Sequence, residues 1–135
     1  MAKLSPSSRV IHALDVDSLE KGLEIVEKVS PYVDGIKVSY TLLYQHGISS
    51  FEAICENTSL PVIADLKLAD IPAIVKRLSE KVLEAGVDGV IVHGFCGRDV
   101  VEACVEEAER REAMVFVVAE LSNPGAVEYM KGMGE

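Results

Sequence analysis

The sequence is poor in the residues that mark several classes of protein. It has no tryptophan, 5 % aromatic residues and three cysteines. Cys55, Cys96 and Cys104 have neither the even number of a disulfide framework nor the spacing of metal ligands. We therefore expect free thiols in a reducing, cytoplasmic compartment.

Membrane and nucleic-acid binding are also disfavoured by what the sequence lacks. No apolar run reaches the roughly 18 residues of a membrane span, and residues 1–6 show no apolar signal-peptide core. The net charge of −9 argues against broad binding to nucleic acid or to anionic membranes. It still permits a small anionic substrate, because local lysines can outweigh the global field at short range.

The chain has 135 residues, of which 49 % are hydrophobic, enough for the core of one domain. Short β-rich runs alternate with longer helical runs, without a linker. We expect strands at residues 9–15, 35–39, 61–66, 88–93 and 114–120. Several of them are nearly continuous apolar runs, which is typical of parallel strands covered on both faces.

The helical segments carry recognisable start and stop signals. Asp17, with Glu20 three residues later, predicts the N-cap of the first helix, and Pro31 predicts its end. A second helical stretch should run to about Glu56, and a third should begin near Pro72. The residues expected on the apolar faces of the third and fourth helices are Val75, Leu78 and Val82, and Val101, Cys104, Val105 and Ala108. A sixth element should begin after residues 122–125.

Each expected strand ends in polar or ionisable residues: Asp15, Lys37 with Ser39, Asp65 with Lys67, His93, and Glu120 with Ser122. Repeated βα units leave two architectures, a closed barrel or an open doubly wound sheet. Polar groups at five consecutive strand ends favour the barrel, whose chemistry lies at the carboxyl ends of its strands. Any single one of these residues could be polar simply because strand ends are exposed to solvent.

The densest cluster is Asp65-x-Lys67-x-x-Asp70. Strand alternation places Asp65 and Lys67 on one face, whereas Asp70 lies beyond the strand end. Carboxylates beside a lysine favour its charged form, which suits a proton donor. Two alternatives stay open at this point: part of a site for a hard metal ion, or a surface salt-bridge cluster.

The segment Asp65-Leu66-Lys67-Leu68-Ala69-Asp70-Ile71-Pro72 resembles the D-x-K-x-x-D-I-P signature of the orotidine 5′-phosphate decarboxylases. Further segments resemble the same family in order along the chain: 13–15, 35–37, 92–95 and 120–126. The resemblance implies an α/β fold, a (β/α)₈ TIM barrel of the ribulose-phosphate-binding type. Residues 1–135 would form a single domain that supplies about five of the eight βα units.

The resemblance also implies an activity, the decarboxylation of orotidine 5′-phosphate to UMP without metal or organic cofactor. Lys67 would stabilise and protonate the carbanion, Asp65 would lie near the departing carboxylate, and Lys37 would complete the charge network and contact the ribose. Asp15 would bind a ribose hydroxyl and Ser122 the pyrimidine edge. His93 would either contact the ligand or be a hydrogen-bonded core histidine.

In this family the residues corresponding to Asp70 and Ile71 reach into the neighbouring subunit's site. The resemblance therefore implies a homodimer in which Asp70 is catalytic and Ile71 binds substrate across the interface.

Two departures from the family pattern stand out. Ile74 occupies a position where the family usually has threonine, and the sequence ends at Glu135, before the family's phosphate-binding glutamine and arginine. We expect the 135-residue chain alone to be inactive, with unpaired strand edges and an exposed apolar lumen. The alternatives are a magnesium-dependent phosphosugar synthase or decarboxylase of the same superfamily, similar to hexulose-phosphate synthase, and an inactive half-barrel fragment.

Overall fold

The computed structural model describes residues 7–130 and contains the five expected strands. They are β1 (Ile11–Leu14), β2 (Gly35–Ser39), β3 (Val62–Leu68), β4 (Gly89–His93) and β5 (Met114–Val118). The prediction of five strands is confirmed. The predicted ends differ for β3, which continues through Lys67 to Leu68, and for β1 and β5, which are shorter than expected.

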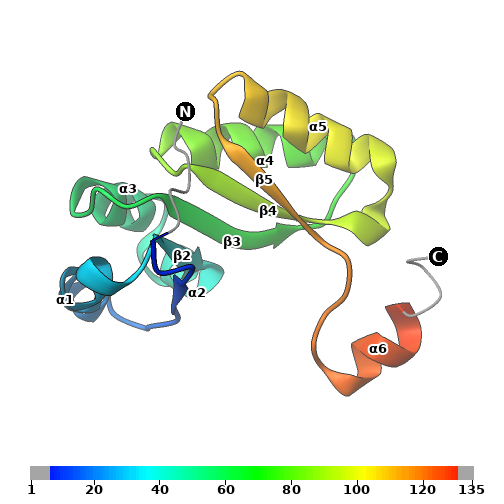
Figure 1. Ribbon diagram of the computed structural model, residues 1–135. Helices are drawn as coiled ribbons and strands as arrows, with labels where there is room; N and C mark the ends of the chain where they lie inside the picture. Colours follow the sequence, from blue (N-terminus) through cyan, green and yellow to red (C-terminus); the bar gives the residue numbers. More distant parts are fainter. Residues whose placement is uncertain (1–6, 131–135) are drawn as a thin grey trace.

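The order of the strands decides between the two architectures. All neighbouring pairs are parallel, and the sheet order β1-β2-β3-β4-β5 follows the chain (Figure 1). Crossovers of one hand between successive neighbours place the helices that connect the strands on the same face of the sheet. An open doubly wound sheet would instead reverse its strand order and cover both faces. The chain is therefore part of a (β/α) barrel.

The helices are α1 (Leu19–Val29), α2 (Tyr40–His46), α3 (Ser49–Glu56), α4 (Pro72–Glu84), α5 (Arg98–Glu109) and α6 (Pro124–Met130), with short 3₁₀ turns η1 (Ser30–Tyr32) and η2 (Gly94–Cys96). Along the sheet, α1 and α2 contact α3, and α4 contacts α5. Figure 1 shows α6 standing apart from the sheet, at the end of the segment that follows β5. Within the described residues, no helix is long and apolar enough to cross a membrane.

The start of α1 differs from the sequence prediction by one residue. The N-cap is Ser18, whose hydroxyl oxygen accepts a hydrogen bond from the Lys21 backbone N–H at 3.4 Å. Asp17 was therefore the wrong N-cap, because the side chain that faces the free N–H groups belongs to the next residue. The α-helix ends at Val29, and Pro31 lies inside η1 rather than directly ending the helix.

The stretch expected as one helix up to Glu56 is two helices. Gly47 interrupts it with φ at +70°, in the left-handed region that favours glycine. The Gly47 N–H still bonds the Leu43 carbonyl and so closes the last turn of α2. The chain then turns into α3, which buries Phe51 and Ile54 against the sheet.

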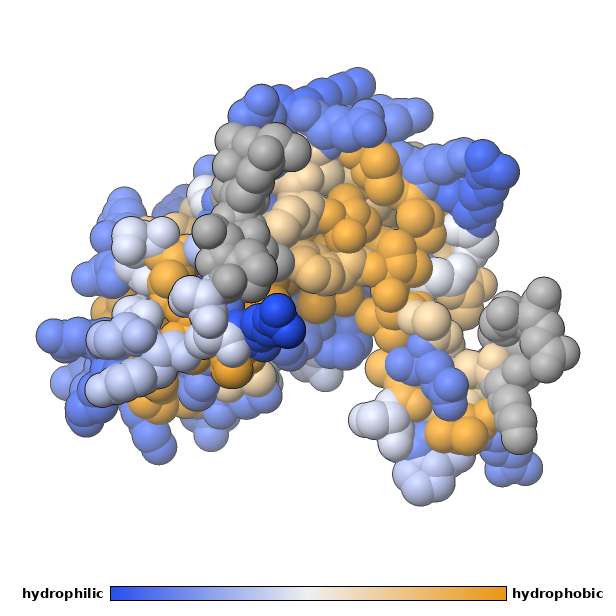
Figure 2. All heavy atoms as spheres, viewed as in Figure 1, coloured by the Kyte–Doolittle hydropathy of each residue, from blue (hydrophilic) through white to orange (hydrophobic). Residues whose placement is uncertain are grey.

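The hydrophobic core is deepest under the middle of the sheet. Side chains of β2, β3 and β4 such as Ile36, Val62 and Val90 are fully buried. At the two edge strands, by contrast, Ile11 is 38 % and Val117 50 % exposed. Figure 2 shows hydrophobic residues gathered on the surface where β5 crosses the visible face. Within the described part of the chain, β1 and β5 each pair with one strand, so the expected exposed edges are present.

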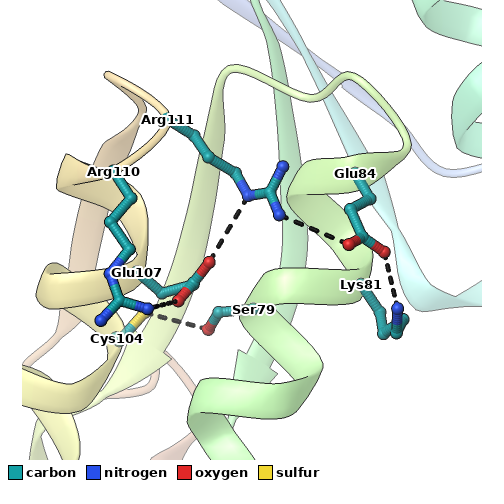
Figure 3. Close-up of polar contacts among 7 residues, drawn as sticks. All are labelled: Ser79, Lys81, Glu84, Cys104, Glu107, Arg110 and Arg111. Carbon is teal, nitrogen blue, oxygen red and sulfur yellow. Dashed lines mark hydrogen bonds and ion pairs between the residues drawn. The ribbon is translucent and has the colours of Figure 1, made fainter.

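Contacts between charged side chains join the C-terminal ends of α4 and α5 (Figure 3). The Glu107 carboxylate, only 4 % exposed, accepts a hydrogen bond from Arg110 and lies 3.5 Å from Arg111 Nε. Arg111 also donates to Glu84 on α4. Buried charge is tolerated here because guanidinium groups pair with it on both sides.

The predicted apolar face of α4 is correct for Val75 and Val82 but wrong for Leu78, which is 44 % exposed. Leu78 faces a hollow of about 340 Å³ between α2 and α4, together with Tyr40 and Tyr44. The buried residue at that turn is Ser79, because the side of α4 that meets α5 is rotated by one position. On the predicted face of α5, Cys104 and Ala108 are buried, and Val101 and Val105 are half-buried.

Candidate active site

The polar residues predicted at the strand ends gather along one edge of the sheet, since parallel strands all end on the same side. Lys37 lies in β2 opposite Ile63, and Ser39, the last residue of β2, lies opposite Asp65. His93 is the last residue of β4. The fold therefore brings the central three of the predicted groups to the same part of the barrel mouth.

Lys37, Asp65 and Lys67 form a group of charges that we call the Lys–Asp–Lys triad. Lys67 Nζ donates a hydrogen bond to Asp65 Oδ1 at 2.6 Å, and Lys37 Nζ donates to Oδ2 of the same carboxylate. Asp65 is 3 % exposed, whereas about a third of each lysine side chain remains open to solvent. The triad thus holds two ammonium groups at the surface by means of one buried carboxylate, and its net charge is positive.

The ionisation of Asp65 depends on these two lysines. Burial by itself would raise the pKa of the Asp65 carboxyl group, but the hydrogen bonds and charges of Lys37 and Lys67 outweigh it. The pKa of Asp65 therefore lies below its ordinary value of 3.8. Two lysines held by one carboxylate can stabilise negative charge that develops on a substrate and can supply a proton.

The position of Lys67 depends on an irregularity in β3. Ala64 pairs with Val90 and Leu68 with Val92, so three residues of β3 stand opposite one residue of β4. Lys67 lies in this bulge with φ at +45°, a conformation that costs a non-glycine residue roughly 1 kcal/mol or more. Bulges redirect side chains. The sequence predicted that Asp65 and Lys67 lie on one face of the strand; their side chains do meet, although the strand is bulged there and not regular.

His93 lies beside the triad and is 7 % exposed. Its ring packs against Phe95, with 4.8 Å between the ring centroids. Within residues 7–130, its buried Nδ1 has no hydrogen-bond partner. Burial lowers the pKa of His93, the charge of Lys67 lowers it further, and Asp65 opposes both effects. The imidazole is therefore uncharged at neutral pH.

Asp70 and Ile71 lie outside the triad. Asp70 Oδ1 accepts a hydrogen bond from the Ile71 backbone N–H at 2.7 Å, and Asp70 forms no ion pair with a described residue. Ile71 is 63 % exposed, and Pro72 behind it begins α4. Beside them is a hollow of about 540 Å³, lined by residues 69–72 and by Phe95, Cys96, Asp99 and Val100.

Asp15 and Ser122 follow β1 and β5, as predicted, and both are exposed. Neither forms a hydrogen bond or ion pair with another residue in the described part of the chain. Glu120 is likewise exposed beyond the end of β5. These residues are therefore available at the two edges of the mouth, where the sheet is not covered.

Sequence reasoning missed two neighbours of the site. Thr41 places its hydroxyl 2.6 Å from that of Ser39, directly behind the end of β2. Phe95 covers His93 and is 51 % exposed. Thr41 could have been suspected, because a hydroxyl just after a strand that ends in lysine and serine falls at the barrel mouth. Phe95 ends the segment 92–95 that resembles the family, but that resemblance gave it no role. Within residues 7–130, no group of three histidine, cysteine, aspartate or glutamate side chains is arranged to hold a metal ion.

Comparison with known proteins identifies relatives along nearly the whole chain. A protein of Methanosarcina barkeri named orotidine 5′-phosphate decarboxylase is 45 % identical over 132 residues, which are 98 % of this chain and 59 % of that protein. The solved structure of orotidine 5′-monophosphate decarboxylase from Methanocaldococcus jannaschii, complexed with the inhibitor BMP, superposes with a TM-score of 0.87 at 40 % identity. The superposition covers 93 % of this chain and 58 % of that one.

A more distant structure, an uncharacterized conserved protein from Geobacillus kaustophilus, has a TM-score of 0.73 at 28 % identity, over 88 % of this chain and 58 % of that one. The chain thus spans a little under three fifths of the length of these relatives. The sequence model of the family described as Orotidine 5′-phosphate decarboxylase / HUMPS matches residues 8–134. The chain therefore belongs to the orotidine 5′-phosphate decarboxylase / HUMPS family.

Proposed function

We propose that the protein containing this chain decarboxylates orotidine 5′-phosphate to UMP in de novo pyrimidine biosynthesis. The observation that carries the proposal is the Lys–Asp–Lys triad, in which a buried carboxylate holds two partly exposed lysine side chains at the mouth of a barrel. Membership of the family and relatives named for this activity add to it. A cytoplasmic location is part of the proposal, in keeping with the free thiols of Cys55, Cys96 and Cys104.

The reaction breaks the bond between C6 of the pyrimidine and its carboxylate carbon, leaving the electron pair on C6 in the plane of the ring. Little resonance relieves that charge, so the catalyst must stabilise it electrostatically. Lys67 is the donor that places an ammonium group against C6 and then protonates it. Asp65 holds Lys67 in place and lies near the departing carboxylate. Lys37, on the other oxygen of Asp65, faces the ribose.

The remaining predicted residues line the rest of the site in this proposal. Asp15, exposed after β1, binds a ribose hydroxyl, and Ser122, exposed after β5, hydrogen-bonds the pyrimidine edge. His93 forms the wall next to Lys67. The edges of the mouth are open in the described chain, which leaves room for a ligand between these groups.

We further propose that the protein is a homodimer in which Asp70 and Ile71 enter the site of the other subunit. The support is complementary charge. The triad carries a net positive charge, while Asp70 is exposed, and among the described residues its carboxylate is bonded only to the backbone N–H of its neighbour. Ile71, at 63 % exposure, would gain from burial at such an interface.

The activity is tested on a complete barrel in which residues 1–135 are joined to the part of the Methanosarcina barkeri relative that the match leaves uncovered. Loss of orotidylate absorbance is followed with and without EDTA. We expect turnover that is insensitive to EDTA; turnover that requires a divalent metal would support the magnesium-dependent phosphosugar chemistry of the same superfamily instead. The 135-residue chain alone should show negligible turnover, because binding energy from the phosphate end of the substrate normally drives the chemical step.

Shared sites are tested by mixing two inactive variants of the complete barrel, Lys67→Ala and Asp70→Asn. If Asp70 serves the neighbouring site, hybrid dimers contain one intact site, and re-assembled mixtures should recover about a quarter of the wild-type activity. Mixtures that stay as inactive as the separate variants would show that Asp70 serves its own subunit.

A further inference from the structure

Two serines occupy the same position at the start of a helix but use their side chains differently. Ser18 is the N-cap of α1, and its hydroxyl oxygen accepts a hydrogen bond from the Lys21 backbone N–H. Ser39 is the N-cap of α2 and is 9 % exposed, yet its side chain makes no capping hydrogen bond with the described residues of that helix. Because such a cap normally stabilises a helix, the Ser39 side chain has given it up for another contact.

That contact is with Thr41, the second residue of α2. The two hydroxyl oxygens are 2.6 Å apart, and Thr41 Oγ1 also donates to the Val16 carbonyl oxygen at a long 3.5 Å. A hydroxyl group has a single proton, so Ser39 is the donor in the shorter bond when Thr41 donates to Val16. These side chains, which we call the Ser39–Thr41 pair, thus link the end of β2 to the segment that follows β1.

Val16 directly follows Asp15, the residue that binds a ribose hydroxyl in the proposed function. Within residues 7–130, the ladder between β1 and β2 ends at Leu14, so strand pairing does not reach Asp15. The Val16 side chain lies against α1, so close to Gly22 that a β-carbon added there would be 3.4 Å from Val16 Cγ2. Val16 is therefore held from two sides, by α1 through its side chain and by Thr41 through its carbonyl group.

The other end of the Ser39–Thr41 pair lies at the triad. Ser39 is the register partner of Asp65, whose carboxylate accepts hydrogen bonds from both lysines. Lys37 stands two residues before Ser39 in β2, and strand alternation places the two on one face. The pair therefore connects the strand that carries Lys37 with the segment that carries Asp15. These are the two groups that the proposed function assigns to the ribose.

We propose that the Ser39–Thr41 pair is a positioning device, which holds the segment after β1 against the end of β2 and so fixes where the Asp15 carboxylate meets the ribose. Neither hydroxyl takes part in the chemical step. Without the pair, the exposed Asp15 would have to be ordered when substrate binds, and the cost of that ordering weakens binding. The inference rests on the proposed function, since it requires Asp15 to contact the ribose.

The first test is kinetic and uses the complete barrel. Thr41→Val keeps nearly the same shape and removes the hydroxyl. We expect KM to rise about 3- to 10-fold, the size of one lost hydrogen bond, with a smaller change in kcat. Thr41→Ser keeps the hydroxyl and should restore KM. The matched control is Thr58→Val, because Thr58 is also half-buried but bonds the Leu60 N–H before β3, at the amino end of the sheet.

A double-mutant cycle separates positioning from a general loss of stability. If the pair acts through Asp15, Thr41→Val should raise KM by less than about 2-fold when Asp15→Asn is already present. The Kd of UMP should follow the same pattern. Effects of the two substitutions that simply multiply would show that the pair does not act through Asp15, and they would overturn the proposal. So would an unchanged KM in Thr41→Val alone.

NMR of the complete barrel tests the contact without reference to the reaction. In Thr41→Val the order parameters of the backbone N–H groups of residues 15–17 should fall, and the carbonyl carbon signal of Val16 should move, whereas Thr58→Val should change neither. If the wild-type barrel shows no decarboxylation, the proposed function fails, while NMR still decides whether the pair fixes this segment. If decarboxylation occurs and both NMR readouts in Thr41→Val equal those of the wild type, the function stands and the positioning role is wrong.

Discussion

The two ends of the sheet use aspartate in opposite ways. At the amino end, Asp34 before β2 accepts hydrogen bonds from the backbone N–H groups of Ser7, Ser8 and Arg9, and Asp88 before β4 accepts from Val62 N–H at 2.9 Å. At the carboxyl end, Asp65 accepts from two lysine side chains. Aspartate carboxylates therefore fix the backbone at the amino end of the sheet, whereas at the carboxyl end an aspartate holds the ammonium groups of two lysine side chains.

The comparison shows how a barrel separates stability from chemistry. Backbone N–H donors are neutral and cannot move away, so Asp34 only anchors residues 7–9 beside β2. Ammonium groups on long, flexible side chains can move toward a ligand. Left-handed backbone occurs at both ends, at Arg9 and Lys67, but only at Lys67 does it place a reactive group.

The largest effect is expected when the charge that performs the proposed chemistry is removed. Lys67→Ala in the complete barrel should lower kcat/KM by at least roughly 10³-fold, since both the proton donor and the stabilising charge are lost. The matched control is Lys28→Ala, which removes an exposed lysine of α1 and should leave the rate unchanged. Activity retained in Lys67→Ala would exclude its assigned role.

A smaller but still large effect is expected when the anchor of the triad loses its charge. Asp65→Asn should reduce kcat/KM by on the order of 10²-fold, because two lysines that are no longer held by a carboxylate repel each other and lose their orientation. Thermal stability should change little. A variant that loses its fold instead would mean that Asp65 resembles the aspartates of the amino end.

The reverse pattern is expected at the amino end. Asp34→Asn should lower the Tm by on the order of 5 °C and leave kcat/KM unchanged, because it removes charge-assisted hydrogen bonds to the backbone far from the triad. The control is Asp17→Asn, because Asp17 is exposed and has no hydrogen-bond or ion-pair partner among the described residues. A loss of activity without loss of stability would contradict the division between the two ends.

The effect of Asp34 should depend on pH in a defined direction. The backbone N–H of Ser7 is the largest of several influences that hold the pKa of Asp34 far below its ordinary value of 3.8, while burial opposes them. A carboxyl group with a lowered pKa in the folded state stabilises that state above its ordinary pKa and loses this contribution as the pH falls. The Tm difference between wild type and Asp34→Asn should therefore be full at pH 7 and shrink below about pH 4, as calorimetry can measure.

The smallest expected effect concerns the thiols. Burial, with a contribution from Asp88, raises the pKa of Cys55 to about 11, and burial also raises the pKa of Cys104. Both should therefore react slowly with iodoacetamide at pH 8, and Cys96, beside the hollow at the carboxyl end, should be alkylated first. Peptide mass spectrometry of a time course gives the order; equal rates for all three would contradict it.

Much of the architecture could be predicted from the sequence, because strands and helices are marked by residues that are close together in the chain. The five strands and their polar ends depend on runs of apolar residues and on the residue that comes next, and Gly35–Ser39 was predicted to the residue. The errors occurred where a local signal was shared by neighbouring positions. Asp17 and Ser18 are both good N-caps, and only the backbone direction selects Ser18. Leu78 fits the helical period of α4, but the side of α4 that meets α5 leaves it exposed.

The sequence by itself determined the alternation of strands and helices and the presence of Asp65, Lys67, Lys37 and His93 at strand ends. Only the tertiary structure decided the order of the strands, and with it the barrel, because strand pairing joins segments far apart in the chain. It also decided the bulge that turns Lys67 onto Asp65 and the packing that leaves His93 buried and unpartnered in the described chain. Both depend on how β3 and β4 meet, and no run of residues within either strand specifies that.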